Sequence, residues 1–118
     1  MNAQTQNPKF DPKLEQILWY ARDYASRGMV NTALGKLNEA REYATRVGVE
    51  IPEAILTEIQ DTAYRSGVET TLGYARDYAS RGMVNTALGK LNEAREYATR
   101  VGLDITDRVQ VIEATLTK

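Results

Sequence analysis

Apolar residues recur at intervals of three and four along most of the chain, which is the spacing of a helix with one buried face. In the first such segment they fall at Leu14, Ile17, Leu18, Ala21, Tyr24 and Ala25. Asp11 and Pro12 suit the first turn of this helix, because aspartate accepts hydrogen bonds from free N–H groups and proline fits the first helical position. Gly28 is expected to end the helix in a left-handed conformation with positive φ.

The same reasoning predicts two more helices before the middle of the chain. The second begins near Asn31 and ends at Gly48, and its apolar face comprises Ala33, Leu34, Leu37, Ala40, Ala44 and Val47. Pro52 begins the third helix, which carries Ile55, Ile59 and Ala63 on one face and is expected to stop near Tyr64.

A fourth helix is predicted to begin at Ser66, because Ser66 and Glu69 have the spacing of a capping box. The competing interpretation is one continuous helix through Gly67, since a glycine inside a helix costs only about 1 kcal/mol. We favour the break. The fifth helix repeats the second, and the sixth covers roughly residues 107–116 with Val109, Ile112 and Leu116 facing inward.

The chain contains an exact internal duplication. Residues 20–48, YARDYASRGMVNTALGKLNEAREYATRVG, are identical to residues 74–102, so the offset is 74 − 20 = 54. A fold constrains buried positions far more than solvated ones. Identity at polar positions such as Asn38 and Arg46 therefore indicates a copying event, either in an engineered or recombined sequence or in a recent natural duplication.

These elements predict an all-α fold: a six-helix array or bundle made of two tandem three-helix units. Residues 1–10 are expected to be a flexible N-terminal segment, residues 11–65 the first unit and residues 66–118 the second. We expect one joint core, because a unit of about 54 residues is marginally stable alone.

Within the identical blocks, small and large residues follow a known hairpin pattern. The pattern runs through Ala21, Tyr24, Gly28, Ala33, Leu37 and Ala40, and it recurs at Ala75, Tyr78, Gly82, Ala87, Leu91 and Ala94. It resembles the helical hairpin of tetratricopeptide-type repeats, and other close αα-hairpins such as microtubule-transport-type domains share it. The period is 54 instead of 34, and Thr45 stands where the family has proline. The resemblance implies close helix packing and a peptide-binding activity.

Composition removes most catalytic and metal chemistry. The chain has no cysteine and no histidine, which excludes thiolate sites, the commonest general base and the commonest metal ligand. It carries no phosphate loop, dinucleotide fingerprint or nucleophile motif, and Glu39 and Glu42 fall on the polar face of their helix. We therefore predict no enzyme activity, no catalytic residue, no metal and no cofactor. An apolar run long enough to span a membrane is also lacking, and a cytoplasmic location is the default.

The remaining expectation is a non-enzymatic helical scaffold or protein-interaction module, or an engineered duplication without selected function. A protein partner or self-association is expected, with the oligomeric state left open. Each identical block holds five basic and three acidic residues, whereas the net charge of the whole chain is −1. Because the blocks are basic, a nucleic-acid-binding module is the first alternative function. An enzyme is the second alternative.

Trp19, Arg22 and its counterpart Arg76 form the candidate interaction surface. Trp19 lies one step off the apolar stripe, either packed under a neighbouring helix or exposed at an interface. Gly73 replaces Trp19 before the second block, and we expect Gly73 to be the more buried of the two, against a close helix.

Overall fold

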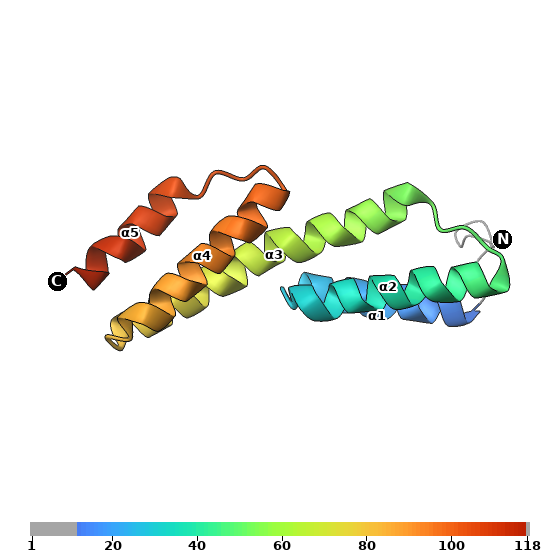
Figure 1. Ribbon diagram of the computed structural model, residues 1–118, viewed down its shortest axis with the longest axis horizontal. Coiled ribbons are helices and arrows are strands. Elements are labelled where there is room, and N and C mark those ends of the chain that lie inside the picture. Colours follow the sequence, from blue (N-terminus) through green and yellow to red (C-terminus); the bar gives the residue numbers. More distant parts are fainter. Residues whose placement is uncertain (1–11, 118) are drawn as a thin grey trace.

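The computed structural model describes residues 12–117, and within them the chain is all-α, with five helices and no strand. The helices are α1 (Pro12–Ser26), α2 (Val30–Val47), α3 (Glu53–Ser80), α4 (Val84–Arg100) and α5 (Thr106–Leu116). They form an elongated molecule of 59 × 21 × 20 Å, with α3 running through its middle (Figure 1). The predicted cap at Asp11 and the segment 1–10 lie outside the described residues.

The predicted break between a third and a fourth helix is wrong. α3 runs without interruption through Ser66 and Gly67 for 28 residues, so residues 12–117 form five helices where six were expected. A break would leave up to four N–H and four C=O groups in need of new partners. Continuing the helix costs only about 1 kcal/mol for the interior glycine, which is the smaller penalty.

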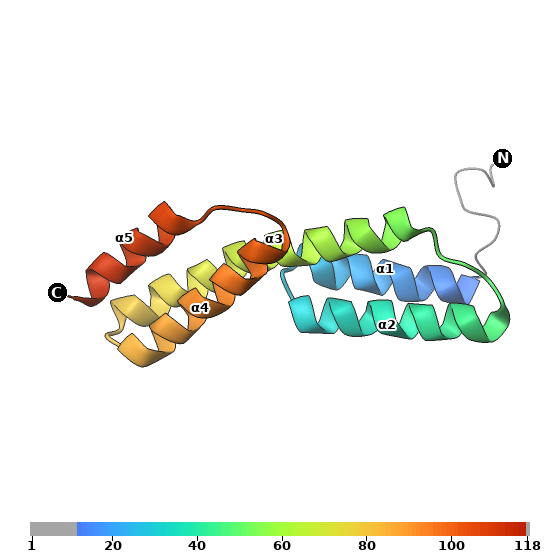
Figure 2. The same ribbon diagram turned by 45° about the horizontal axis from the view of Figure 1, so that its top comes forward.

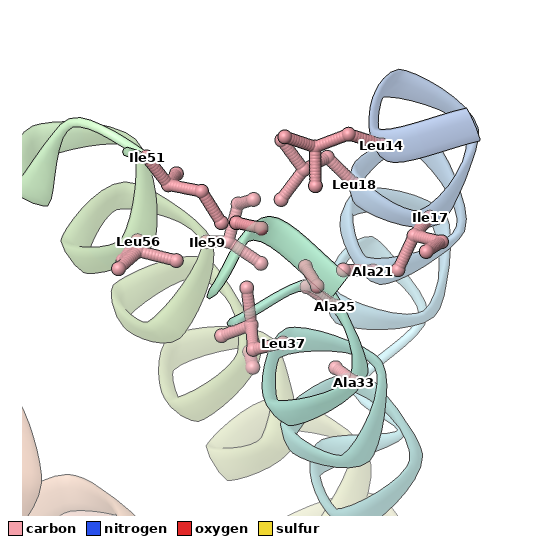
Figure 3. Packing of buried hydrophobic residues seen from close by; sticks show 13 residues of the cluster. Leu14, Ile17, Leu18, Ala21, Ala25, Ala33, Leu37, Ile51, Leu56 and Ile59 are labelled. Carbon is pink, nitrogen blue, oxygen red and sulfur yellow. The ribbon is translucent and has the colours of Figure 1, made fainter. Parts of the chain in front are cut away.

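The buried apolar side chains form two clusters, one at each half of α3, and the single joint core that we expected is not observed. The N-terminal bundle consists of α1, α2 and the first half of α3, and it buries Leu14, Leu18, Leu37 and Ile59 among others (Figure 3). The C-terminal bundle consists of the second half of α3 with α4 and α5 (Figure 2). α3 is therefore the element that the two bundles share.

The two identical sequence blocks adopt the same local structure, as their identity predicts. Gly28 and Gly82 have φ of 74° and 75°, the left-handed conformation expected from the sequence. After each glycine the backbone N–H of a methionine bonds back across the turn, from Met29 to Tyr24 O at 3.0 Å and from Met83 to Tyr78 O at 2.9 Å. Each block thus forms a complete helical hairpin.

The surroundings of the two hairpins differ because the first one packs against the middle of α3. A β-carbon at Gly67 would overlap Val30 Cγ2 and would lie 3.2 Å from Tyr97 Cδ2. A β-carbon at Gly28 would likewise overlap Thr70 and lie 2.8 Å from the backbone oxygen of Ser66. The missing side chain at Gly67 is therefore what allows α2, α3 and α4 to meet at the junction of the two bundles.

Val30 and Val84 show the consequence for identical residues. Val30 is 4% exposed under α3, whereas Val84, its counterpart in the second block, is 40% exposed. A β-carbon at Gly82 would meet no atom within 4 Å. The turn that is covered at the junction is thus open at the far end of the molecule.

Replacing these two valines by alanine gives a matched test of the junction. Val30→Ala is expected to lower the free energy of unfolding by about 2 kcal/mol, because it removes buried methyl groups from a closely packed site. Val84→Ala should cost well under about 1 kcal/mol, since much of that side chain already contacts water. Urea denaturation of both variants measures the difference. Equal losses would contradict the packing of Val30 against α3.

Gly67→Ala tests the close approach itself through a double-mutant cycle. In the wild-type background we expect a loss of stability, because the new methyl group displaces the stiff Val30 side chain. In the Val30→Ala background the same change should cost less, by about 1 kcal/mol, since only the 3.2 Å approach to Tyr97 Cδ2 remains and alanine is the better helix former. Urea denaturation of the four proteins gives the coupling. The same cost in both backgrounds would show that Val30 does not determine the need for glycine.

Candidate interaction surface

Trp19 lies on the outer face of α1 and is 59% exposed. Its ring meets the ring of Tyr20 edge to face, with centroids 5.3 Å apart, and Lys36 Nζ lies 5.7 Å from the centroid of Tyr20. The interpretation in which Trp19 packs under a neighbouring helix is therefore wrong. An indole exposed to this extent loses much of the favourable burial that a tryptophan normally gains.

Gly73 does not lie against a helix, so the expectation that it is a buried close-contact glycine is also wrong. It is exposed on α3, and a β-carbon built there would meet no atom within 4 Å. The glycine that close packing requires is Gly67, six residues earlier. Gly73 instead leaves the outer face of the C-terminal bundle without a side chain where the N-terminal bundle has Trp19.

Arg22 lies one turn after Trp19 and links α1 to α3. Its Nη2 atom is 3.9 Å from Glu58 Oε1, and both side chains are largely exposed. An exposed ion pair at this distance contributes little to stability, because water screens it and both side chains lose conformational freedom. Trp19, Arg22 and Glu58 together form one surface, which we call the Trp19 edge.

In the C-terminal bundle the last helix begins one residue earlier than the duplication would place it. α3 begins at Glu53 and α5 at Thr106, an offset of 106 − 53 = 53. Pro52 has no N–H, whereas its counterpart Thr106 donates its backbone N–H to Asp104 Oδ1 at 3.0 Å. That bond lowers the pKa of the Asp104 carboxyl and gives the first backbone N–H of α5 a partner.

The buried residues of the two helices confirm this shift. In α3 Leu56 and Ile59 are buried, and in α5 Val109 and Ile112 are buried, so the offset is 53 at both positions. At the same offset Val111 corresponds to Glu58. Val111 therefore occupies the place of the carboxylate that faces Arg22 in the N-terminal bundle.

Arg76 consequently lies beside an apolar groove. The groove measures about 240 Å³ and is lined by Arg76, Ser80, Val111, Ile112 and Thr115. Val111 is 67% exposed, the highest value among the large apolar residues of the described chain. Arg76 has no ion pair in the described part of the chain within 4 Å. Gly73, Arg76 and Val111 define a second surface, the Arg76 edge.

The three residues that the sequence predicts as one interaction surface lie on two different bundles in the structure. Trp19 and Arg22 lie together on the N-terminal bundle, and Arg76 lies on the other bundle. Sequence reasoning missed Glu58 and Val111. Val111 could have been noticed, because it is an apolar residue one position away from the Val109, Ile112 and Leu116 stripe.

Two ion pairs hold α5 against its neighbours. Arg108 binds Glu69 of α3 through two hydrogen bonds, of 2.6 and 2.9 Å, and Arg95 of α4 binds Glu113 at 2.9 Å. The hydrogen bonds from Arg108 lower the pKa of the Glu69 carboxyl. A two-point arginine–carboxylate pair fixes orientation as well as distance, so the groove beside Arg76 has a defined shape.

A second groove, of about 370 Å³, lies at the junction beside Val30, Tyr64 and Tyr97. The rings of Tyr64 and Tyr97 are 5.8 Å apart, and Tyr97 donates its hydroxyl to Glu93 Oε2 at 2.9 Å. Burial, followed by the bond to Glu93, raises the pKa of Tyr97 to about 12. Two of the titratable groups that line this groove, Tyr97 and Glu93, are therefore engaged with each other.

Neither a metal-binding group of side chains nor a membrane-spanning helix is found among residues 12–117. Residues 12–117 contain no group of three or more acidic side chains placed to hold a metal. Over the same residues, none of the helices combines the length and the apolar character that a membrane span requires.

The raised pKa of Tyr97 predicts a pH dependence. Unfolded tyrosine titrates near 10, so the contribution of Tyr97 to stability is fully present below pH 10 and is lost as the pH rises from about 10 to about 12. The absorbance of tyrosinate is measured against pH for the wild type and for Tyr97→Phe. Subtracting the second curve from the first isolates Tyr97 among the seven tyrosines of the chain. We expect a difference curve centred near 12, shifted downward by Glu93→Gln. A difference curve centred near 10 would contradict the burial of Tyr97.

Comparison of this chain with protein-family models, with curated proteins and with solved structures finds no match.

Proposed function

We propose that this protein is a non-enzymatic helical repeat scaffold or protein-interaction module, built of tandem three-helix units that share α3. The observation that carries the proposal is the outward position of Trp19, which is 59% exposed and has no counterpart in the C-terminal bundle. Exposed tryptophans are enriched at the centres of protein interfaces, where their burial supplies much of the binding energy.

The shape of the molecule supports a scaffold role. Two bundles with separate cores are joined by one continuous helix, and their junction is closed by Val30, Gly67 and Tyr97. Such a connection keeps the Trp19 edge and the Arg76 edge at a fixed separation. The hairpin spacing of Ala21, Gly28 and Ala33 is in keeping with the tetratricopeptide-type resemblance, whose family activity is the binding of peptides.

The distribution of charge favours a protein partner over a nucleic acid. In each identical block two of the five basic side chains pair with an acid of the same block, in Arg27–Asp23, Lys36–Glu39, Arg81–Asp77 and Lys90–Glu93. Binding to a phosphate backbone requires several free cations along one surface. These pairs instead suit an ordinary solvated surface.

The groups with shifted pKa values have structural partners, which supports a non-enzymatic role. Glu69 is bound to Arg108, Tyr97 to Glu93, and Asp104 to Thr106. A catalytic acid or base is usually a perturbed group that faces an open cleft. In this protein each perturbed group is held by a partner within the fold, including Tyr97, which lines the junction groove but donates its hydroxyl to Glu93.

Cross-linking in cells that express the full chain tests this function. We expect proteins to be cross-linked to the chain, with recovery that falls at least several-fold in Trp19→Ala but not in the control Tyr74→Ala. Tyr74 is a suitable control because it is another exposed aromatic residue, 52% exposed on α3. Recovery of nucleic acid by ultraviolet cross-linking, with no protein dependent on Trp19, would overturn the proposal in favour of a nucleic-acid-binding module.

A further inference from the structure

The Trp19 edge and the Arg76 edge are complementary at two of their three matching positions. Where the first has Trp19, the second has Gly73 and an open space; where the first has Glu58, the second has the exposed Val111. The arginine is the only member that both edges keep. The Trp19 edge therefore has a projecting ring and a carboxylate, and the Arg76 edge lacks both.

We propose that the Arg76 edge binds the Trp19 edge of a second copy of this chain. The indole of the incoming Trp19 lies over Gly73 and against Val111 and Ile112, at the groove beside Arg76. This inference rests on the proposed function, because it names one partner of the interaction module.

Three physical effects favour this contact over continued exposure. Burial of an indole and of Val111, which are 59% and 67% exposed, removes apolar surface from water on both sides. The face of an indole attracts a guanidinium group, so Arg76 can interact with the incoming ring. The incoming Glu58 supplies a direct carboxylate partner for Arg76, which in its own bundle has only the longer-range attraction of Glu69, a carboxylate already bound to Arg108. In its own bundle Glu58 is 3.9 Å from Arg22.

The contact cannot form within one chain. Trp19 belongs to the N-terminal bundle and Arg76 to the C-terminal bundle, and α3 together with the packing of Val30 on Gly67 holds the bundles apart (Figures 1 and 2). A tryptophan on one bundle therefore reaches the groove on the other only in a second molecule. Two different surfaces meeting in this way give either a closed pair with two equivalent contacts or a head-to-tail chain.

The single tryptophan of the chain makes the contact measurable. Trp19→Ala has no tryptophan and keeps the groove, whereas Val111→Glu keeps Trp19 and places a carboxylate in the groove. Both residues are exposed, so both variants should retain the circular dichroism of the wild type. Gln110→Glu, at the exposed neighbouring position on α5, controls for the added charge.

Sedimentation equilibrium and tryptophan emission give the expected results. Wild type and Gln110→Glu should associate at concentrations on the order of 0.1 to 1 mM, as suits a small contact, with a blue shift of the emission. Trp19→Ala and Val111→Glu should each remain monomeric over this range. A mixture of the Trp19→Ala protein with the Val111→Glu protein should restore the blue shift and contain 1:1 pairs, because one supplies the groove and the other the tryptophan. A chain that carries both substitutions should show neither the shift nor association.

Two outcomes would overturn this inference. One is a wild-type protein that stays monomeric, with unshifted tryptophan emission, at concentrations up to about 1 mM. The other is self-association that persists in both single variants, which would place the contact elsewhere. Either outcome leaves the proposed function standing if cross-linking recovers other proteins through Trp19, so the two failures can be told apart.

Discussion

Val30 lies against Gly67 in the middle of α3, and this contact fixes how the two bundles meet. A side chain at position 67 would overlap Val30 and crowd Tyr97, so three helices come together only because the residue there is glycine. The glycine weakens α3 by about 1 kcal/mol, and burial of Val30 offsets that cost. Since α3 does not end at the junction, the direction of one bundle determines the direction of the other. The positions of both outer edges follow from this one contact.

The identical blocks show how far sequence alone sets structure. Each block folds into the same hairpin with the same left-handed glycine, because the turn hydrogen bonds and the apolar stripe are local. Their surroundings are set from outside the block. Val30 is covered because α3 continues past it, whereas Val84 is 40% exposed at a turn that no other helix packs against as closely. The register of α5 likewise depends on Pro52 and Thr106, which the duplication does not include.

Helices, turns and most of the core could be predicted from the sequence, since they depend on residues close to one another in the chain. The continuity of α3 could not. Ser66 and Glu69 have the spacing of a cap, but a break there would leave backbone groups without partners, at a greater cost than the interior glycine. The contact of Gly67 with Val30 and Tyr97 explains why the residue at this point is glycine. Gly73 and Gly67 are both glycines within α3, and no local pattern distinguishes the exposed one from the buried one. The candidate surface was predicted in part: Trp19, Arg22 and Arg76 were identified, but Glu58 and Val111 required the register of the third helix of each bundle.

The differences between the two bundles lie where the duplication ends. The shared blocks supply the hairpins, and identical hairpins alone would give both bundles the same outer face. Trp19 and Gly73 immediately precede the blocks, and Glu58 and Val111 follow them. Among the residues that the blocks share is the arginine at positions 22 and 76, and these four residues determine what surrounds it. Arg22 faces the carboxylate of Glu58, whereas Arg76 lies beside the apolar groove at Val111. Identical hairpins with different flanking residues thereby present two unlike surfaces, which is the minimum that the proposed head-to-tail contact between copies requires.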